Sequence, residues 1–265
     1  MSLCIQGTSL TGLLGATALL SVAFLGAMPA AQAAELQVQV TIAVRVAVGE
    51  MAAAFEKRTG HTIKITVAAP GEIVAALQAG RHADVVVLTD GGLTELEDKG
   101  LVRRNRVPLA TSAFGLATRS GDLVPDISTP EALRAVLLGA SKVIYNDPKT
   151  TPSGQVLLRV AERLGIAEQI RAKSQVVAGG TSVSTLAKDT GPGFAVALAP
   201  LTEIPGHPGT KLVGPLPKEL QVQISFSAVL GTHPENEALA QAFLDSLTSA
   251  EAKKAYVATG FDVEK

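Results

Sequence analysis

Short runs of β-branched and apolar residues alternate with longer amphipathic stretches along this chain. The alternation predicts strands at residues 36–42, 62–67 and 84–88, with helices between them at 46–58 and 72–78. The third strand is uninterrupted and apolar after its first residue, which is typical of a strand buried on both faces of a parallel sheet. Strand, helix, strand, helix, strand in succession predicts right-handed crossovers and a parallel sheet. The chain is therefore expected to belong to the α/β class.

A second series of alternating elements follows the first. The sequence Thr129-Pro130-Glu131 predicts a helix start, because Thr caps, Pro suits the first turn and Glu favours the helix dipole. Further elements are predicted as strands at 114–118, 142–145, 194–198 and 220–230, and as helices at 153–164, 234–247 and 250–257. We expect the chain to build one lobe, cross to a second lobe, and return to complete the first.

The N-terminal segment is typical of an export signal. The first 34 residues contain no Asp, Glu, Lys or Arg, and residues 10–28 are almost all apolar or small. Ala31-Gln32-Ala33 then offers small residues for signal peptidase, which predicts that residues 1–33 are removed and that the protein is periplasmic. Only the terminal amine is positive before the apolar run, so an uncleaved membrane anchor is the alternative.

Composition excludes several classes of function. The chain has 23 basic and 24 acidic residues, and this balance argues against a nucleic-acid partner. The only cysteine, Cys4, lies in the segment predicted to be removed, so no disulfide and no thiolate metal site are expected. The four histidines lack metal-ligand spacing, and no serine lies in a nucleophile-elbow sequence. We therefore expect no metal and no cofactor.

Five segments of the chain share one pattern with a known family. They are AAAFEKRTGHTIKI, PGEIVAALQAGRHADVVVLTD, ISTPEALRAVLL, NDPKTTPSGQVLLRVAERLGI and FLDSLTSAEAKKAYVATGF, in a match that extends from about Leu36 to Phe261. Together these segments resemble the periplasmic molybdate-binding protein family. The resemblance implies a type II periplasmic-binding-protein fold, with two α/β lobes joined by two crossing strands and a ligand held in the cleft. Lobe I is then expected to comprise residues 34–113 and 220–265, and lobe II residues 114–219.

In such a fold, ligand contacts are expected where strand ends meet helix starts, because the first N–H groups of a helix are unpaired and partially positive. Four such corners are predicted, with Thr41, Ile42, Pro70, Gly71, Ser153, Gly154, Thr181, Ser182 and Val183 as candidate ligand-binding residues. The Ser153-Gly154 corner has the strongest argument, since Gly154 would let a ligand approach the backbone closely. Ordinary helix caps and flexible turns are the alternative interpretation.

The first two corners depart from the pattern of the family that the chain resembles. The family usually places a serine at each, whereas this chain has Thr41 followed by Ile42 at one and Ala69-Pro70 at the other, and a tyrosine is missing near residues 198–200. Each missing donor would cost a buried oxyanion about 1–3 kcal/mol, so molybdate is not expected to bind well. Arg45 could instead hold a carboxylate through two parallel hydrogen bonds, or simply be a solvated helix residue.

The residues support two main hypotheses of function. The first is a monomeric receptor that captures a small anion, a carboxylate or an oxyanion, for the inner-membrane permease of an ABC-type transporter. The second, implied by isomerases that resemble this family, is isomerisation of a small tricarboxylate such as aconitate. Glu72 or Asp147 would then be the base if it faced the cleft with a raised pKa. A sensor domain for a membrane kinase is a third alternative if the signal is not cleaved, and Asp84 is interpreted as a structural cap.

Overall fold

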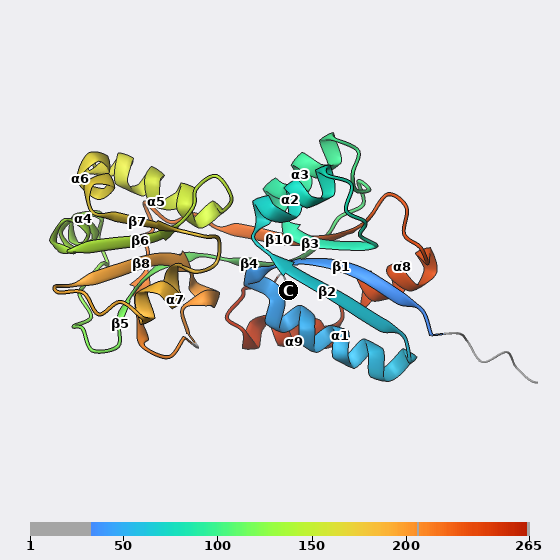
Figure 1. Ribbon diagram of the computed structural model, residues 1–265. Coiled ribbons are helices and arrows are strands. Elements are labelled where there is room, and N and C mark those ends of the chain that lie inside the picture. The colour runs from blue at the N-terminus through green and yellow to red at the C-terminus, as the bar shows by residue number, and fades with distance from the viewer. Residues whose placement is uncertain (1–32, 206, 264–265) are drawn as a thin grey trace, which may run out of the picture. The chain divides into compact units, whose positions relative to one another are not determined.

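The computed structural model describes residues 33–205 and 207–263, so the predicted signal up to residue 32 lies outside the described residues. Two five-stranded mixed sheets form the framework, with strand orders β2-β1-β3-β10-β4 and β7-β6-β8-β5-β9. Helices cover both faces of each sheet (Figure 1). The two-lobed α/β fold is thereby confirmed, while the exact lobe boundaries stay a prediction.

The first sheet is formed from both ends of the described chain. Its strands are β1 (Glu35–Thr41), β2 (Thr62–Ala68), β3 (Val85–Thr89), β4 (Val107–Ser112) and β10 (Ile224–Leu230). The helices around it are η1 (Ile42–Val44), α1 (Arg45–Thr59), α2 (Pro70–Gln78), α3 (Asp90–Asp98), α8 (Glu237–Ser246) and α9 (Ala250–Ala258). As predicted, β1, β2 and β3 are parallel, whereas β10 runs antiparallel to β3 and β4.

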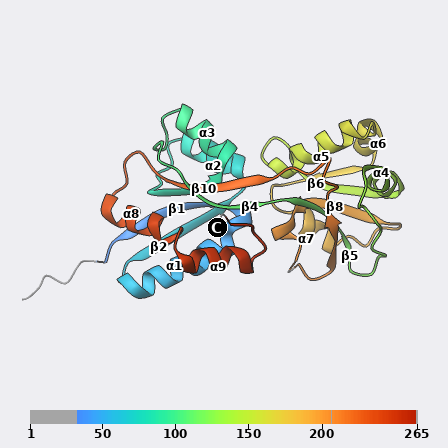
Figure 2. The same cartoon turned by 180° about the vertical axis from the view of Figure 1, so that it is seen from behind.

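The second sheet is formed by the middle of the chain. Its strands are β5 (Phe114–Arg119), β6 (Lys142–Asn146), β7 (Ser174–Val177), β8 (Ala195–Pro200) and β9 (Thr210–Pro215). Around it are α4 (Pro130–Gly139), α5 (Pro152–Arg163), α6 (Ala167–Ala172), α7 (Ser182–Ala187) and η2 (Leu201–Glu203). Figure 2 shows the same arrangement from behind. The sequence did not predict β7, β9, α3 and α6, and of α7 it predicted only the start.

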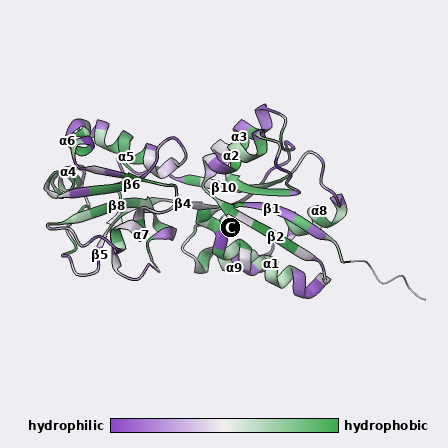
Figure 3. Cartoon of the chain, viewed as in Figure 1, coloured by the Kyte–Doolittle hydropathy of each residue, from purple (hydrophilic) through white to green (hydrophobic). Residues whose placement is uncertain are grey.

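Each sheet has an apolar core on both of its faces. One face of the first sheet packs against α1, α8 and α9, and the other packs against α2 and α3. In the second sheet, α4, α5 and α6 cover one face and α7 covers the other. Figure 3 shows the central strands as mainly hydrophobic, with hydrophilic residues on the outer helices and loops. Burial on both faces explains why β3, β6 and β8 are apolar runs rather than alternating ones.

The chain crosses between the sheets twice, first from β4 to β5 and then from β9 to β10. The predicted strand at 220–230 is shorter, because a turn at residues 218–220 and an irregular segment at 221–223 precede Ile224 and belong to no sheet. In that segment the Gln221 amide accepts from the Phe114 N–H at 3.0 Å and donates to the Phe114 carbonyl at 2.9 Å. The Gln221 side chain thus makes the hydrogen bonds that a neighbouring strand would make, and it links the two crossing segments.

Candidate functional site

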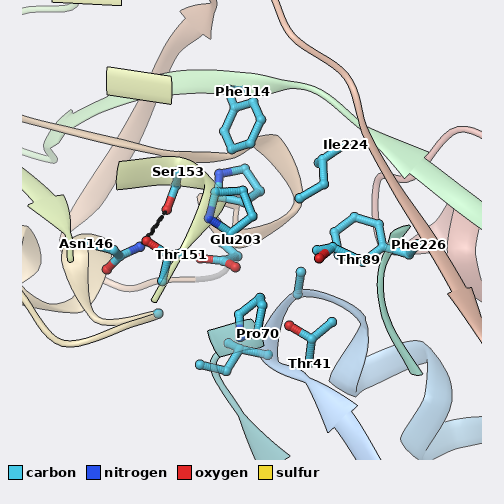
Figure 4. Close-up of a pocket in the computed structure, with 15 residues that line it drawn as sticks. Thr41, Pro70, Thr89, Phe114, Asn146, Thr151, Ser153, Glu203, Ile224 and Phe226 are labelled. Atoms are coloured by element: carbon cyan, nitrogen blue, oxygen red, sulfur yellow. Dashed lines mark hydrogen bonds between the residues drawn. The ribbon is translucent and has the colours of Figure 1, made fainter. Parts of the chain in front are cut away.

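A small cavity lies where strand ends and helix starts of the two sheets face each other (Figure 4). The residues that line it are Thr41, Ile42, Ala43, Pro70, Thr89, Phe114, Asn146, Thr151, Pro152, Ser153, Gly180, Pro200, Glu203, Ile224 and Phe226. Only about 30 Å³ can hold the centre of a water molecule, which is room for a few waters at most. Four of the predicted residues therefore line it, namely Thr41, Ile42, Pro70 and Ser153.

The corner after β1 offers unpaired donors. Thr41 makes no side-chain cap to η1, so the first N–H groups of this turn have no capping partner. Among the residues that the structure describes, none bonds to the Thr41 hydroxyl, and Figure 4 shows this hydroxyl directed into the cavity. Thr41 itself is almost fully buried. This corner can therefore donate to a ligand oxygen without giving up an internal hydrogen bond.

The corner at the start of α5 faces it from the other sheet. The Thr151 hydroxyl caps the helix by accepting from Gly154 N–H at 3.3 Å and donates to the Asp147 carbonyl at 2.9 Å. Pro152 brings no N–H, so Ser153 supplies the first backbone donor of the helix. The Ser153 hydroxyl accepts from the Asn146 side chain at 3.0 Å and donates to the Thr151 hydroxyl over a long 3.5 Å, a weak bond that a ligand oxygen can replace.

Asn146, at the end of β6, organises this side of the cavity and was not predicted. Its side-chain oxygen accepts from the N–H groups of Thr181 and Ser182 at 3.1 and 3.0 Å. The donors predicted for a ligand at this corner are therefore already used. Thr181 and Ser182 lie outside the cavity lining, and Val183 packs in the apolar core beneath α7. Of the fourth predicted corner only Gly180 reaches the cavity.

The corner before α2 is also partly different from the prediction. Pro70 lines the cavity, but the Gly71 N–H donates at 3.0 Å to the carbonyl of Thr150, in the loop between β6 and α5. A Cβ added to Gly71 would lie 2.9 Å from the Thr150 Cα. Gly71 therefore joins the two sides of the cleft, and its N–H group is not free to donate to a ligand in this cavity.

Gly154 has a packing role and does not line the cavity. A Cβ at this position would lie 2.1 Å from the Asn146 carbonyl oxygen and 2.7 Å from the Pro148 nitrogen. The prediction that Gly154 lets a ligand approach is corrected accordingly: the loop before α5 occupies that space.

We expect Gly154→Ala to lower the free energy of unfolding by about 3 kcal/mol, because the backbone that meets the new methyl group cannot move aside cheaply. Urea denaturation measures this. Gly49→Ala is the matched control, since a Cβ in that turn of α1 meets nothing within 4 Å, and it should stabilise by up to about 1 kcal/mol. Equal effects of the two substitutions would contradict the packing role.

Two carboxylates proposed as bases lie outside the cavity lining. Glu72 is exposed and accepts from the Ala69 N–H at 3.1 Å, so it completes the start of α2. Asp147 accepts from the Lys149 N–H at 2.9 Å and shapes the loop before α5. The prediction that either could face the ligand is corrected on these contacts.

The carboxylate that does line the cavity is Glu203, in η2 directly after β8. Figure 4 shows it between the Thr151 side and the Thr41 side of the cavity. Its side chain is half-buried, and burial raises its pKa to about 7, while the charge of Arg45 acts in the opposite direction. Within the described part of the chain, no group donates a hydrogen bond to this carboxylate. The sequence signal was available, because Glu203 also follows a strand end.

Arg45 lies at the rim and not in the lining. It is exposed, and its guanidinium donates to the Ile42 carbonyl at 2.9 Å, within its own turn. Its positive charge nevertheless acts on the Glu203 carboxyl group.

Thr89, at the end of β3, is a lining residue that the sequence analysis did not predict. With Thr41, Thr151 and Ser153 it brings the lining to four hydroxyl-bearing residues. The first two corners still contribute only the Thr41 hydroxyl to the lining, and the other three hydroxyl groups come from β3 and from the start of α5.

Two larger cavities share residues with the small one. One, of about 340 Å³, adds Asp90, Gln155 and Arg159 to the shared Thr89 and Pro152. The other, of about 300 Å³, adds Lys149 and Glu95. The cleft therefore has an inner part without a lining cation and outer parts that each hold one.

A cleft between the strand ends of two α/β lobes is typical of two-lobed solute-binding proteins. Residues 36–262 match the model of the bacterial extracellular solute-binding protein family, and the chain belongs to this family. In the described ranges, 33–205 and 207–263, there is no helix with the length and apolarity needed to cross a bilayer. No group of three potential metal-ligating side chains occurs in those same ranges.

Two curated relatives and one solved structure are informative. An aconitate isomerase from Pseudomonas sp is 29% identical over 254 residues, covering 93% of this chain and 94% of the relative. The molybdate-binding protein ModA of Azotobacter vinelandii is 26% identical, covering 89% and 92%. The structure of the Azotobacter vinelandii periplasmic molybdate-binding protein has a TM-score of 0.70 at 19% identity, covering 87% of this chain and all of that one. That last likeness shows the fold.

Proposed function

We propose that this protein captures a small carboxylate anion in the cleft and delivers it to the permease of an ABC-type transporter. The observation that carries the proposal is the pair of donor groups facing each other across the cavity, the uncapped turn after Thr41 and the start of α5 at Ser153. Helix starts and hydroxyl groups hold an anion without a cationic side chain. Because the donors come from both lobes, an anion stabilises the closed arrangement.

Charge favours a carboxylate over a tetrahedral dianion. The inner cavity has no lining cation, and Glu203 is its carboxyl group. Two unit charges of the same sign about 4 Å apart cost about 4 kcal/mol at an effective dielectric constant of 20, so an ionised Glu203 would disfavour a ligand with both charges nearby. A compact dianion would have both charges in this space. A longer ligand with several carboxylate groups can place one of them there and extend the others toward Arg45, Arg159 or Lys149.

The cleft must open for such a ligand to enter, because the inner cavity holds only a few waters. The two sides meet at small residues. A Cβ on Gly180 would lie 2.4 Å from the Ile42 side chain, and one on Gly179 would lie 2.4 Å from the Ala69 Cβ. The two crossings joined by Gln221 are the place where a hinge motion would occur. We propose that the exported protein acts in the periplasm as a monomer.

A thermal-shift screen of the exported protein tests this function. We would compare tricarballylate, citrate, trans-aconitate, molybdate, sulfate and phosphate at equal ionic strength. A ligand at 100 times its dissociation constant adds about 2.7 kcal/mol to stability. At least one carboxylate should raise the melting temperature more than any inorganic anion. Stabilisation by molybdate alone would overturn the carboxylate assignment.

Isomerisation of a tricarboxylate is a second candidate, favoured by the position of Glu203 and by the 29% identity to an aconitate isomerase. A carboxyl group with a pKa of about 7 is suited to take a proton and return it. Glu203 would remove a proton from the CH₂ carbon of cis-aconitate, the double bond would shift, and the same proton would be returned to the far alkene carbon.

Proton NMR of cis-aconitate with the enzyme detects this reaction directly. Appearance of trans-aconitate with the unmodified protein, and its loss in Glu203→Gln but not in Glu72→Gln, would establish the isomerase. Binding of aconitate without any conversion would contradict the isomerase and agree with the receptor function.

A further inference from the structure

Glu203 is an acidic group in an inner cavity whose other polar lining residues are neutral. It lines the inner cavity together with Thr41, Thr89, Thr151 and Ser153. Its carboxylate receives no hydrogen bond from any residue in the described part of the chain, and Figure 4 shows it among the groups that would surround a ligand. An ionised carboxylate there would repel an anion, whereas a protonated one would add a donor.

We propose that Glu203 is a specificity-determining residue whose carboxyl group is protonated in the liganded state and donates a hydrogen bond to the bound anion, so that each anion is taken up with a proton. This inference rests on the proposed capture of an anion in the cleft. It distinguishes Glu203 from the other lining residues, which are neutral in both states. The anion and the proton then leave the cleft together when it opens.

The surroundings of Glu203 support this role from every side of the cavity. The lining residues from β6 and α5 are Asn146 and Ser153, which are neutral, and those from β10 are Ile224 and Phe226, which are apolar. Arg45, at the start of α1, is the charged group whose field reaches Glu203. It donates to the Ile42 carbonyl and forms no ion pair with Glu203 among the described residues.

The pH range in which anion affinity changes follows from the direction in which the pKa of Glu203 is shifted. Burial raises the pKa of Glu203 to about 7, so the unliganded cleft releases this proton as pH rises through 7. A neighbouring anion raises the pKa further, because it favours the neutral carboxylic acid. Anion affinity should therefore be constant well below pH 7 and fall by about tenfold per pH unit above it, until the pKa of the liganded state is reached.

Isothermal titration calorimetry with tricarballylate as the probe tests the proposal. Tricarballylate has no double bond to shift, and it is fully ionised at pH 8, so it carries no proton into the cleft. Titrations at pH 8 in Tris and in HEPES, which have different ionisation enthalpies, give the number of protons taken up. We expect about 0.9 proton for the unmodified protein. At pH 5.5 the cleft itself should take up almost none.

Glu203→Gln keeps the shape and the donor but cannot titrate. Its proton uptake at pH 8 should be zero, and its affinity should be constant between pH 6 and 8.5. At pH 8 it should bind about tenfold more tightly than the unmodified protein. Glu219→Gln, which removes one exposed carboxylate outside the cavity lining, should behave like the unmodified protein.

Binding of tricarballylate with no proton uptake at pH 8 would overturn the role of Glu203 and leave the proposed function intact. Loss of binding in Glu203→Gln at every pH, with an unchanged melting temperature, would also overturn it, because the carboxylate would then be an acceptor. Failure of the unmodified protein to bind any carboxylate or inorganic anion would overturn the proposed function and the inference with it. If the Gln variant did not fold, the buffer comparison on the unmodified protein would still decide.

Discussion

Replacing Asp84 by Asn should lower the free energy of unfolding by about 3–5 kcal/mol, because a buried carboxylate is removed and one of its buried donors is left without an acceptor. Asp84 has no exposed surface. Its two carboxylate oxygens accept from the Gln37 N–H at 2.6 Å and from the Glu235 N–H at 2.7 Å, and His82 lies 3.1 Å away. An Asn must turn its NH₂ group toward one of these donors, so one N–H loses its partner.

Urea denaturation at pH 7 measures the effect, with Asp98→Asn as the control. Asp98 pairs with Arg104 at the surface, where both side chains are about two-thirds exposed, so its loss should cost less than about 1 kcal/mol. A cost for Asp84→Asn as small as that of the control would contradict the view that this carboxylate ties β1, β3 and the loop before α8 together. The sequence interpretation of Asp84 as a structural cap agrees with these contacts.

Asn146→Asp should weaken anion binding by at least about a hundredfold while the protein stays folded. A carboxylate at this position still accepts from the Thr181 and Ser182 N–H groups, so the loop before α7 keeps its support. It cannot donate to the Ser153 hydroxyl, and it adds a negative charge to the lining of the inner cavity. Calorimetry with tricarballylate at pH 6 measures the loss.

The matched control for this substitution is Asn236→Asp, which makes the same chemical change at the N-cap of α8. Asp and Asn cap helices about equally well, so neither stability nor anion affinity should change by more than about 0.5 kcal/mol. Undiminished binding in Asn146→Asp would mean that the anion does not lie in the inner cavity.

The strand-end rule accounts for the part of the site that the sequence predicted. Thr41 is the last residue of β1, Ser153 lies in the first turn of α5, and both line the cavity. Thr89 and Glu203 obey the same rule after β3 and β8, and they were missed because the rule was applied to only four corners. These residues were therefore within reach of sequence reasoning.

Other parts of the site depend on contacts that no local pattern contains. The N–H groups of Thr181 and Ser182 are occupied by Asn146, which is 35 and 36 positions earlier in the sequence. Gly154 resembles a glycine that admits a ligand, but the carbonyl of Asn146 fills that space. Glu72 and Asp147 have the right chemistry for a base, yet backbone N–H groups orient them elsewhere.

The fold was more predictable because both sheets depend on apolar runs that are visible in the sequence. The strands β1, β2, β3, β6 and β8 were predicted within about two residues of their ends, which is the usual uncertainty of such boundaries. The error at 220–230 arose because an alternating pattern continues into the irregular segment at Gln221, where a side chain takes over the hydrogen bonds of a strand.

The central claim, that a carboxylate and not molybdate is the ligand of this cleft, is tested most directly by calorimetric competition at pH 6. Tricarballylate and molybdate would be titrated singly and against each other into the unmodified protein and into Arg45→Lys, which keeps the charge but loses the paired donors. We predict that the carboxylate binds more tightly than molybdate and loses affinity in Arg45→Lys, by about tenfold or more. Submicromolar molybdate binding that survives this substitution would contradict the account.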